Sequence, residues 1–531
     1  GEDLGLRLRQ RVREVLTVGG SPSRLGGRVM AIVIALGLGA GMPVAGTSPV
    51  PSPGTPLPSP GVIPVPEPTV SPGGLAWGPC DGLDSGGIEC ATLAVPVDWG
   101  LADAGVPTAT FDLLLARRPA TGDPAERIGS LVIARGPLGA PSVPFLPALA
   151  DALEPAIGAR FDVVTWDTRG TGGSSPVRRC PEPELSLPAT GRVDWSAVLG
   201  DARRAWRTAN RACRSRNGEA IGHMGTRQTI RDLDAIRAAL GDDRLSFWGV
   251  GSATRIATAY ARSFPGRVRA LVMDGSEDPD PTLVSLVLGA AAPDEALGDL
   301  YAADPDLPAA WSSVRAALET RTIELPSGRR LTRWDLDDAV ARGIGTRATQ
   351  AALAELIRLA DAALSGDAPA SADALARLDA LDIASARASL GSSARAAIDC
   401  ADLPDRIRGR EALELAASVR ARAPIGGSLA PIAGLTACEG LRVASDPIPR
   451  DVPPDPSLPV LILGATRDAD RPYAWTAAMA RAFPAGRVAT TVGPPDRNAG
   501  LMTSSCVDPV VAAYLIDLVL PDADIACPVV R

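Results

Sequence analysis

The chain has 531 residues, 46% of them hydrophobic, so it can bury a large core and form two or three structural units. Its formal net charge is −8, and its basic residues are spread over many helical segments instead of forming a stripe. This composition excludes a small disulfide-stabilised knot and an electrostatic footprint for nucleic acid, so nucleic acid is not expected as a partner.

The N-terminal part has the order of an export signal. Residues 1–28 are a basic segment, and residues 29–46 (VMAIVIALGLGAGMPVAG) are apolar and uncharged. The small residues at 44–46 suit cleavage by a signal peptidase, whereas the long basic flank suits an uncleaved membrane anchor. Both alternatives stay open, and both predict a body outside the cytoplasm, either secreted or anchored to the cell membrane.

A stretch rich in Pro, Ser and Gly follows at residues 47–74 (TSPVPSPGTPLPSPGVIPVPEPTVSPGG). It has no apolar periodicity, which is typical of an extended spacer without a core of its own. We expect this linker to hold the folded body away from the envelope.

All eight cysteines lie after this linker. An even number in an exported chain indicates disulfides, and although about a hundred pairings are possible, each sequential pair closes a modest local loop. The expected disulfides are Cys80–Cys90, Cys180–Cys213, Cys400–Cys438 and Cys506–Cys527. A metal site needs Cys or His residues at close spacing, which the sequence lacks, so neither a metal nor another cofactor is expected.

Short β-branched runs alternate with helical patterns along the body of the chain. Continuous apolar strands separated by amphipathic helices predict an α/β fold, a mostly parallel sheet with helices on both faces. The segment Thr226–Leu240 has an apolar face at helical spacing, which predicts a helix packed on that sheet. The expected strands are 128–134 (IGSLVIA), 161–167 (FDVVTWD), 244–248 (RLSFW), 268–274 (VRALVMD) and 459–465 (PVLILGA).

From 281 to 458 the strand signals stop, and helical patterns rich in Ala and Leu take over. Because strands resume at 459, we expect an inserted helical cap over the carboxyl edge of one sheet, whose core is formed by residues 75–280 and 459–531. Ligands in folds of this kind bind at that edge.

Three segments carry a family resemblance. They are FDVVTWDTRGTGGSSP (161–176), LSFWGVGSATRIATAYARSFPGRVRALVMDG (245–275) and PVLILGATRDADRPYAWTAAMARAFP (459–484). In this order they resemble the secreted α/β-hydrolases related to tripeptidyl aminopeptidase, including that family's C-terminal segment. The resemblance implies an α/β-hydrolase fold and the site of a serine peptidase or esterase, with a Ser–His–Asp triad.

Members of that family carry the serine nucleophile in W-G-x-S-x-G, on a tight turn between a strand and a helix. Matching Trp248, Gly249 and Thr254 to this pattern puts Gly251 at the nucleophile position. Ser252 follows directly, but the turn needs small residues two before and two after the nucleophile, and for Ser252 these are β-branched. The sequence thus predicts a turn that lacks both the hydroxyl and the backbone strain of an active enzyme.

Of the other two triad positions, the acid is retained and the base is not. Asp468, in TRDADRP, matches the family's D-x-x-T-P aspartate, the acid of the triad. The family's G-x-G-H base position falls at Asn498, and an amide cannot act as a general base. Without a histidine to orient, we expect Asp468 to hydrogen-bond to its own turn or to the loop around Asn498.

Two further positions are expected at the cleft. The oxyanion loop, G-G-P-G-G-S-G in relatives, is RGPLGAPS in this chain: Gly136 is kept, whereas Pro141 has no N–H to donate. The single histidine of the sequence, His223, lies just before the helix that begins at Thr226. We interpret His223 as a surface or capping residue, with a catalytic role at the mouth of the cleft as the alternative.

We therefore predict an exported, catalytically degenerate hydrolase-fold protein that binds a peptide, a lipid or an envelope component in the cleft under its cap, or a partner on its surface. The alternative is an active serine hydrolase that uses a relocated serine, Ser142, Ser174 or Ser252, with His223 or a carboxylate as the base. Loss of both nucleophile and base removes nearly all triad catalysis, which favours the first hypothesis.

Overall fold

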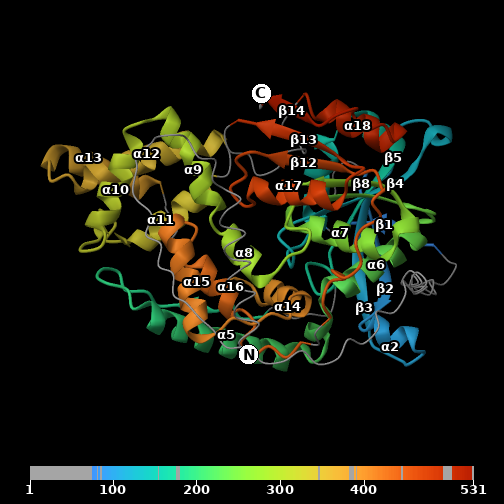
Figure 1. Ribbon diagram of the computed structural model, residues 1–531, viewed down its shortest axis with the longest axis horizontal. Helices are drawn as coiled ribbons and strands as arrows, with labels where there is room; N and C mark the ends of the chain where they lie inside the picture. The colour runs from blue at the N-terminus through green and yellow to red at the C-terminus, as the bar shows by residue number, and fades with distance from the viewer. Residues whose placement is uncertain are drawn as a thin grey trace, which may run out of the picture. The chain divides into compact units, whose positions relative to one another are not determined.

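Ten strands form the central sheet of the computed structural model, and every neighbouring pair from β5 to β14 is parallel (Figure 1). The pairs β1–β2, β2–β3 and β3–β5 are antiparallel. In spatial order the strands are β1 (Gly78–Pro79), β2 (Glu89–Pro96), β3 (Thr110–Arg118), β5 (Phe161–Trp166), β4 (Gly129–Arg135), β7 (Leu245–Val250), β8 (Val268–Asp274), β12 (Leu461–Ala465), β13 (Arg487–Val492) and β14 (Ile525–Pro528).

The structure describes residues 74–80, 82–83, 87–153, 155–174, 180–344, 347–381, 388–389, 391–443, 446–493 and 505–528. The predicted basic segment, the export segment and the linker up to residue 73 lie outside these ranges. Within them, no helix combines the length and the apolar character needed to cross a bilayer.

The predicted α/β architecture with a mostly parallel sheet is confirmed. Each of the five predicted strands is present with ends shifted by two residues at most, and β8 has the predicted bounds. The strands β2 and β3 were not predicted, because their side chains alternate between buried and exposed positions and form no continuous apolar run. Such alternation is typical of antiparallel strands near an edge, where one face is open to solvent.

Helices cover both faces of the sheet. On one face, apolar side chains of three helices join Leu131, Ile133 and Trp248 of the sheet in one buried cluster. These helices are α3 (Leu146–Ala152), α4 (Pro155–Arg160) and α18 (Asp508–Asp517). The other face is covered by α6 (Thr226–Leu240), α7 (Thr254–Ser263) and α17 (Tyr473–Ala482), of which α7 packs on β7 and α17 on β12. The helix predicted at 226–240 is confirmed.

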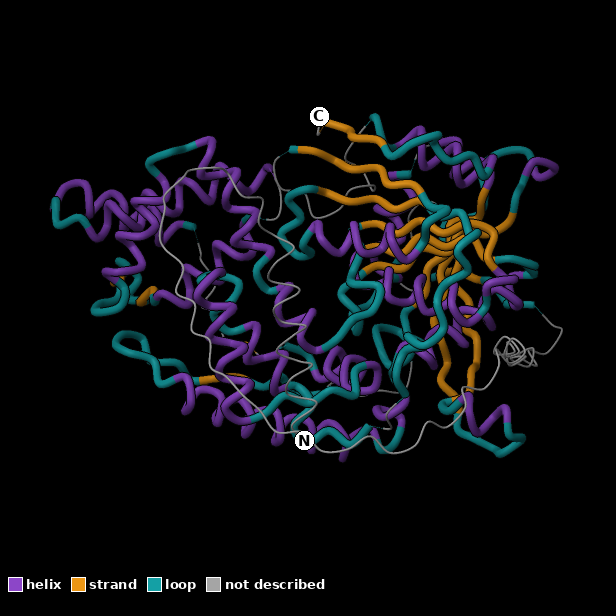
Figure 2. Tube along the Cα trace, in the orientation of Figure 1, coloured by secondary structure: helices purple, strands orange, loops and turns teal. Residues whose placement is uncertain are grey.

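Most of the chain between β8 and β12 is helical, and these helices gather beside the sheet (Figure 2). Their bounds are α8 (Leu283–Gly289), α9 (Ala292–Ala303), α10 (Leu307–Ala317), α11 (Arg333–Gly343), α12 (Arg347–Leu364), α13 (Ala368–Ala380), α14 (Ser393–Asp402), α15 (Gly409–Arg422) and α16 (Ala430–Thr436). Three short strands interrupt them, β9 (Ile323–Glu324), β10 (Arg330–Leu331) and β11 (Ala388–Ser389), so the expectation that strands are absent between 281 and 458 is corrected.

A helix from outside the predicted insertion packs with the cap. The long helix α5 (Trp195–Asn217) precedes β7, yet its apolar side chains share a buried cluster with those of α8, α14, α15 and α16. The short strand β6 (Glu184–Leu185), just before α5, pairs with β11. Two separate parts of the chain therefore build this helical layer, and its division from the core at 281 and 458 stays a prediction.

Four disulfides join Cys80 to Cys90, Cys180 to Cys213, Cys400 to Cys438 and Cys506 to Cys527. These are the sequential pairs that local loop closure favours. Cystines in this number indicate a protein that folds outside the cytoplasm.

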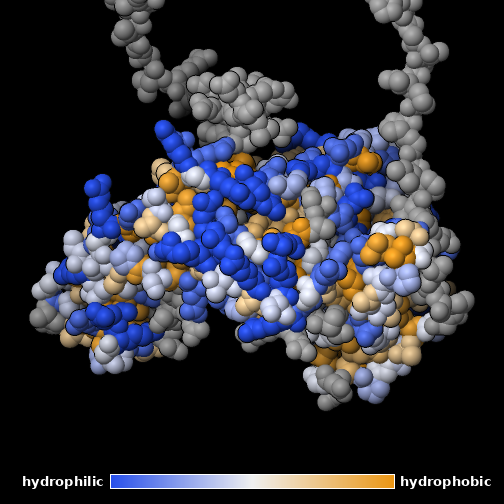
Figure 3. Space-filling model, turned by 90° about the horizontal axis from the view of Figure 1, so that it is seen from below, coloured by the Kyte–Doolittle hydropathy of each residue, from blue (hydrophilic) through white to orange (hydrophobic). Residues whose placement is uncertain are grey.

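A small group of basic side chains lies on one face of α5. Arg204, Arg207 and Arg211 are exposed, and their spacing of three and four residues puts them on one face of the helix. Arg204 pairs with Asp201 and Arg207 with Glu439, so acidic neighbours neutralise part of this row. Figure 3 shows hydrophilic residues over much of the face seen from below. That nucleic acid is no partner stays a prediction.

Candidate active site

The turn between β7 and α7 has Gly251 at its point. The strand leads into a short 3-10 turn over 251–253, and α7 follows directly. Gly251 has a φ of +64°, a left-handed conformation that costs a residue with a Cβ roughly 1–2 kcal/mol. A Cβ on Gly249 would lie 2.9 Å from the carbonyl oxygen of Ala253, so only glycine fits at 249. Gly249 and Ala253 are thus the small residues that stand two before and two after Gly251.

The space next to Gly251 is filled by the guanidinium of Arg471. An ideal Cβ on Gly251 would lie 2.5 Å from Nη1 of Arg471, and a Cβ on Gly275, just after β8, would lie 3.0 Å from its Nε. Cβ atoms do not approach other heavy atoms to 2.5 Å in real structures. A serine side chain at position 251 would therefore require the guanidinium of Arg471 to move from its observed position.

Asp468 holds Arg471 in this position. The carboxylate lies in the turn after β12 and is buried. Its Oδ2 accepts a hydrogen bond from Nε of Arg471 at 3.1 Å and lies 3.0 Å from Nη2. Its Oδ1 accepts from the backbone N–H groups of Asp470 at 2.8 Å and Arg471 at 3.1 Å. Asp468 therefore bonds to its own turn, which includes Arg471.

Both members of this pair are charged at neutral pH. Burial raises the pKa of Asp468 to about 6, although Arg471 and the N–H of Asp470 act to lower it. Burial alone would lower the pKa of Arg471, but the carboxylates of Asp468, Asp470 and Asp274 raise it above its ordinary value. The acid at the triad position is therefore neutralised by an ion pair inside the protein.

The sequence already showed that Arg471 departs from the family motif. In TRDADRP the arginine stands at the threonine of the pattern D-x-x-T-P, but sequence reasoning used only the aspartate of that motif. Nothing local in the motif tells that this side chain reaches Gly251. Asn498, at the predicted base position, lies outside the described residues.

Ser252 faces the loop after β4 and not the point of the turn. Its Oγ accepts a hydrogen bond from the N–H of Leu138 at 3.0 Å, and a Cβ on Gly136 would lie 2.5 Å from that oxygen. The residue is buried. Gly136 thus packs directly on Ser252, and one N–H donor of the predicted oxyanion loop is already engaged.

The other two alternative serines have structural contacts centred on Asp167. Oγ of Ser174 donates to the carbonyl oxygen of Asp167 at 2.6 Å and accepts from the N–H of Leu114 at 2.8 Å. Ser142 donates its backbone N–H to Oδ1 of Asp167 at 2.7 Å. Both serines are buried. They help to order the loops after β4 and β5.

His223 ends a short 3-10 turn before α6 and is partly exposed. Its Nδ1 lies 3.7 Å from Oδ2 of Asp98, the residue that caps α2 (Trp99–Asp103). Its carbonyl oxygen accepts a hydrogen bond from Nη1 of Arg169 at 2.9 Å. Within the described residues, no hydrogen bond or ion pair joins the imidazole to any of the three alternative serines.

Buried ion pairs fasten the cap to the helix behind the turn. Arg255, in the first turn of α7, lies 2.8 Å from Glu277, 2.7 Å from Asp399 and 3.1 Å from Asp402. The two aspartates belong to the cap helix α14. Burial acts to lower the pKa of Arg255, but these carboxylates raise it well above its ordinary value. The elbow helix and α14 are therefore held together by ion pairs in which Arg255 and Asp402 are buried and Asp399 is partly exposed.

The predicted oxyanion loop also touches α14. A Cβ on Gly139, which has a φ of +87°, would lie 2.9 Å from the backbone nitrogen of Arg395. The cap helix therefore lies directly against the loop whose N–H groups a hydrolase needs for its oxyanion.

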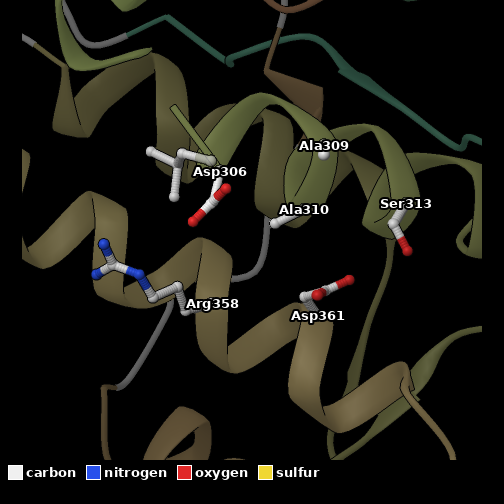
Figure 4. A pocket seen from close by; sticks show the side chains of 7 residues that line it. Asp306, Ala309, Ala310, Ser313, Arg358 and Asp361 are labelled. Atoms are coloured by element: carbon white, nitrogen blue, oxygen red, sulfur yellow. The ribbon is translucent and has the colours of Figure 1, made fainter. Parts of the chain in front are cut away.

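A cavity of about 470 Å³ lies elsewhere, between α10 and α12. Figure 4 shows Asp306 and Ser313 from the segment of α10 facing Arg358 and Asp361 from α12. None of its lining residues belongs to the turn around Gly251. In the described parts of the chain, no group of three or more His, Cys, Asp or Glu side chains is placed to hold a metal ion.

Two family models match the chain. A model described as alpha/beta hydrolase fold matches residues 131–341, from β4 through the turn at Gly251, and one described as TAP-like protein matches residues 427–527. The chain has an α/β-hydrolase fold with a TAP-like C-terminal segment. The resemblance to the family is thereby confirmed for the fold and for this segment.

The curated relatives include peptidases, putative hydrolases and a carboxylesterase by name. Serine protease Hip1 of Mycobacterium tuberculosis (strain ATCC 25618 / H37Rv) is 36% identical over 239 residues, which are 43% of this chain and 45% of Hip1. Tripeptidyl aminopeptidase of Streptomyces lividans is 32% identical over 197 residues, 36% of each chain. The match thus spans less than half the length of these relatives. Among solved structures, proline iminopeptidase of Mycobacterium smegmatis aligns at 15% identity with a TM-score of 0.36, over 81% of this chain and 99% of that one.

Proposed function

We propose that this α/β-hydrolase-fold protein is a non-catalytic member of the tripeptidyl aminopeptidase type, exported from the cytoplasm, that binds a peptide, a lipid or an envelope component. Its ligand is held in the cleft beneath the cap or on the adjoining surface. The observation that carries the proposal is the position of Arg471. Its guanidinium takes the volume that a nucleophile at position 251 would need and pairs with Asp468.

Triad catalysis depends on a hydroxyl, a base and an acid that act as one unit. Gly251 has no side chain, and the sequence has an amide, Asn498, where the base is expected. The acid Asp468 is engaged by Arg471. Removing the nucleophile or the base alone lowers triad catalysis by about six orders of magnitude, so loss of both leaves only the effects of binding and backbone dipoles.

The competing hypothesis of a relocated serine finds little support in the contacts. Oγ of Ser252 is buried under the loop after β4 and accepts the N–H of Leu138. The hydroxyl of Ser174 accepts a hydrogen bond from the N–H of Leu114 and donates one to the carbonyl oxygen of Asp167. His223, the one imidazole of the sequence, lies near Asp98 and Arg169.

The test is labelling of the purified full chain with a fluorophosphonate probe, next to an active serine peptidase as positive control. We expect no labelled serine by mass spectrometry and no turnover on a panel of aryl esters and aminoacyl or tripeptidyl amides. A covalently labelled serine in the wild-type chain, or turnover that the probe abolishes, contradicts the proposal.

A gain-of-function arm asks whether the missing groups account for the inactivity. The variant Gly251→Ser/Arg471→Thr/Asn498→His supplies a nucleophile, clears its space and supplies a base. We expect this triple variant to react with the probe, whereas Gly251→Ser alone stays unlabelled because Arg471 still fills the site. Labelling of Gly251→Ser to the same extent as the triple variant contradicts the role given to Arg471.

A further inference from the structure

Two arginines and two tryptophans form a continuous row in the cap, which we call the cap row. The guanidinium carbon of Arg420, in the last turn of α15, lies 3.8 Å from the ring centroid of Trp195. Trp195 meets Trp334 edge to face, with 6.2 Å between their centroids. The guanidinium carbon of Arg333 lies 4.2 Å from the centroid of Trp334. The row therefore links the first turns of α5 and α11 with the end of α15.

Both guanidiniums of the cap row carry buried N–H donors without an acceptor. These are Nη1 of Arg420 and both Nε and Nη2 of Arg333. A buried donor left unpaired costs about 1–3 kcal/mol, and more when the group is charged. Native proteins keep few such groups, and an unseen ion or ligand is one of the recognised explanations.

Among the residues that the structure describes, no carboxylate is a direct partner of either guanidinium. Burial lowers the pKa of Arg420 to about 10, with no acidic neighbour to oppose it. Burial also lowers the pKa of Arg333, although Asp337 and Glu319 act to raise it. Asp337 is engaged by Arg315 instead, with 3.3 Å between Oδ1 and Nε. The cap row is thus a partly buried site in which no acidic group among the described residues opposes the effect of burial on Arg420, and Asp337 and Glu319 balance Arg333 only in part.

Another arginine of α15 has a carboxylate partner, although in the described residues buried guanidinium nitrogens without a hydrogen-bond acceptor also occur at Arg118, Arg255 and Arg262. Arg410, also on α15, pairs with Glu414 at 2.6 Å and is almost fully exposed. The indole N–H of Trp334 donates to the carbonyl oxygen of Pro188 at 2.9 Å, which fixes that ring in place. The aromatic part of the row is therefore satisfied, and the guanidiniums alone lack acceptors.

We propose that the cap row binds an oxyanion, the carboxylate or phosphate group of a small ligand. A guanidinium presents planar, paired N–H donors that match the geometry of both groups. Stacking on an indole ring keeps the guanidinium plane oriented before the ligand arrives. The first turns of α5 and α11 lie in the same region, where their N-terminal N–H groups are already capped by Asp194 and by Thr332 with Asp335. This site does not depend on whether the turn at Gly251 is catalytic.

The test compares inorganic phosphate, succinate and chloride at equal ionic strength, using the full chain. We expect phosphate, succinate or both to raise the Tm of the wild type above its value in chloride, because an anion that binds the folded state stabilises it. A response to phosphate alone that Arg333→Met/Arg420→Met loses assigns a phosphate ligand, and such a response to succinate alone assigns a carboxylate. Identical Tm values in the three salts overturn the proposal.

Variants locate the effect. In Arg333→Met/Arg420→Met, calorimetric titration is expected to give a Kd at least about tenfold weaker, since a charge-assisted hydrogen bond is lost. Its Tm in chloride is expected to equal or exceed that of the wild type, because unpaired buried charges are removed. Arg410→Met, on the same helix, should keep the full anion response. The single variants are measured in parallel, and a full response retained in both overturns the proposal.

Discussion

Nη1 of Arg471 lies 2.5 Å from the point where a side chain on Gly251 would begin. The two residues are 220 positions apart in the sequence, yet they share one volume at the carboxyl edge of the sheet. Glycine at one position and arginine at the other are therefore a matched pair. The first two predictions follow from this relationship.

Replacing Gly251 by serine should destabilise the fold. The left-handed φ and the overlap with Arg471 together should lower the free energy of unfolding by about 2–4 kcal/mol, measured by urea titration. Gly241→Ser is the matched control, because Gly241 has a φ of +79° and no atom within 4 Å of its ideal Cβ. It should lose only about 1–2 kcal/mol. Equal losses in the two variants would mean that Arg471 does not occupy the site.

Replacing Arg471 by methionine should leave the carboxylate of Asp468 buried without a cationic partner. We expect a loss of about 3–5 kcal/mol in the free energy of unfolding at pH 8. Because burial already raises the pKa of Asp468 to about 6, protonation should relieve much of this loss by pH 5. Asp468→Asn/Arg471→Met, which removes both charges, should lose less than Arg471→Met at pH 8. A loss in Arg471→Met that does not change between pH 8 and pH 5 argues against the ion pair.

Replacing Arg255 by methionine should loosen the cap. Glu277, Asp399 and Asp402 would lose the cation that they share, at an expected cost of about 3–5 kcal/mol. Limited proteolysis should then cut within residues 281–458 faster than in the wild type. Arg410→Met, which breaks an exposed pair, should change stability by less than about 1 kcal/mol. Equal protease resistance of Arg255→Met and wild type would show that the network does not fasten the cap.

Asp337 should make stability depend on pH. Burial raises the pKa of this carboxyl to about 7, against the opposing effect of Arg315 and Arg333. The folded state then binds one more proton than the unfolded state between about pH 4 and pH 7, so stability falls as pH rises through that window. Asp337→Asn should flatten this part of the profile, measured as Tm at pH 5 and pH 8. Asp405→Asn, at an exposed site, should leave the wild-type slope unchanged.

Local patterns were sufficient to predict the elements that neighbours in the sequence determine. Strand β8 and helix α6 have the predicted bounds because a continuous apolar run and an amphipathic repeat each specify one structure. The position of a glycine at the point of the turn could be predicted as well, since the turn motif spans only a few residues. Pairing of nearby cysteines follows the same local logic.

Long-range packing explains what the sequence did not predict. The helix α5 joins the cap through contacts with α14, α15 and α16, which lie about 200 residues further along the chain. The contact of Arg471 with Gly251 depends on the relative placement of the parallel strands β7 and β12. In the sheet these strands are separated only by β8, but in the sequence the whole helical layer lies between them. Neither relation has a signature within a short window of sequence.

The matched pair also constrains how this protein could change over generations. A serine at position 251 would displace the guanidinium of Arg471, and removing Arg471 first would leave the buried carboxylate of Asp468 without its cation. Either substitution made alone is expected to lower the stability of the protein, so each residue disfavours a change at the other. A serine at position 251 would therefore be tolerated best together with a change at Arg471, or in a stabilised background.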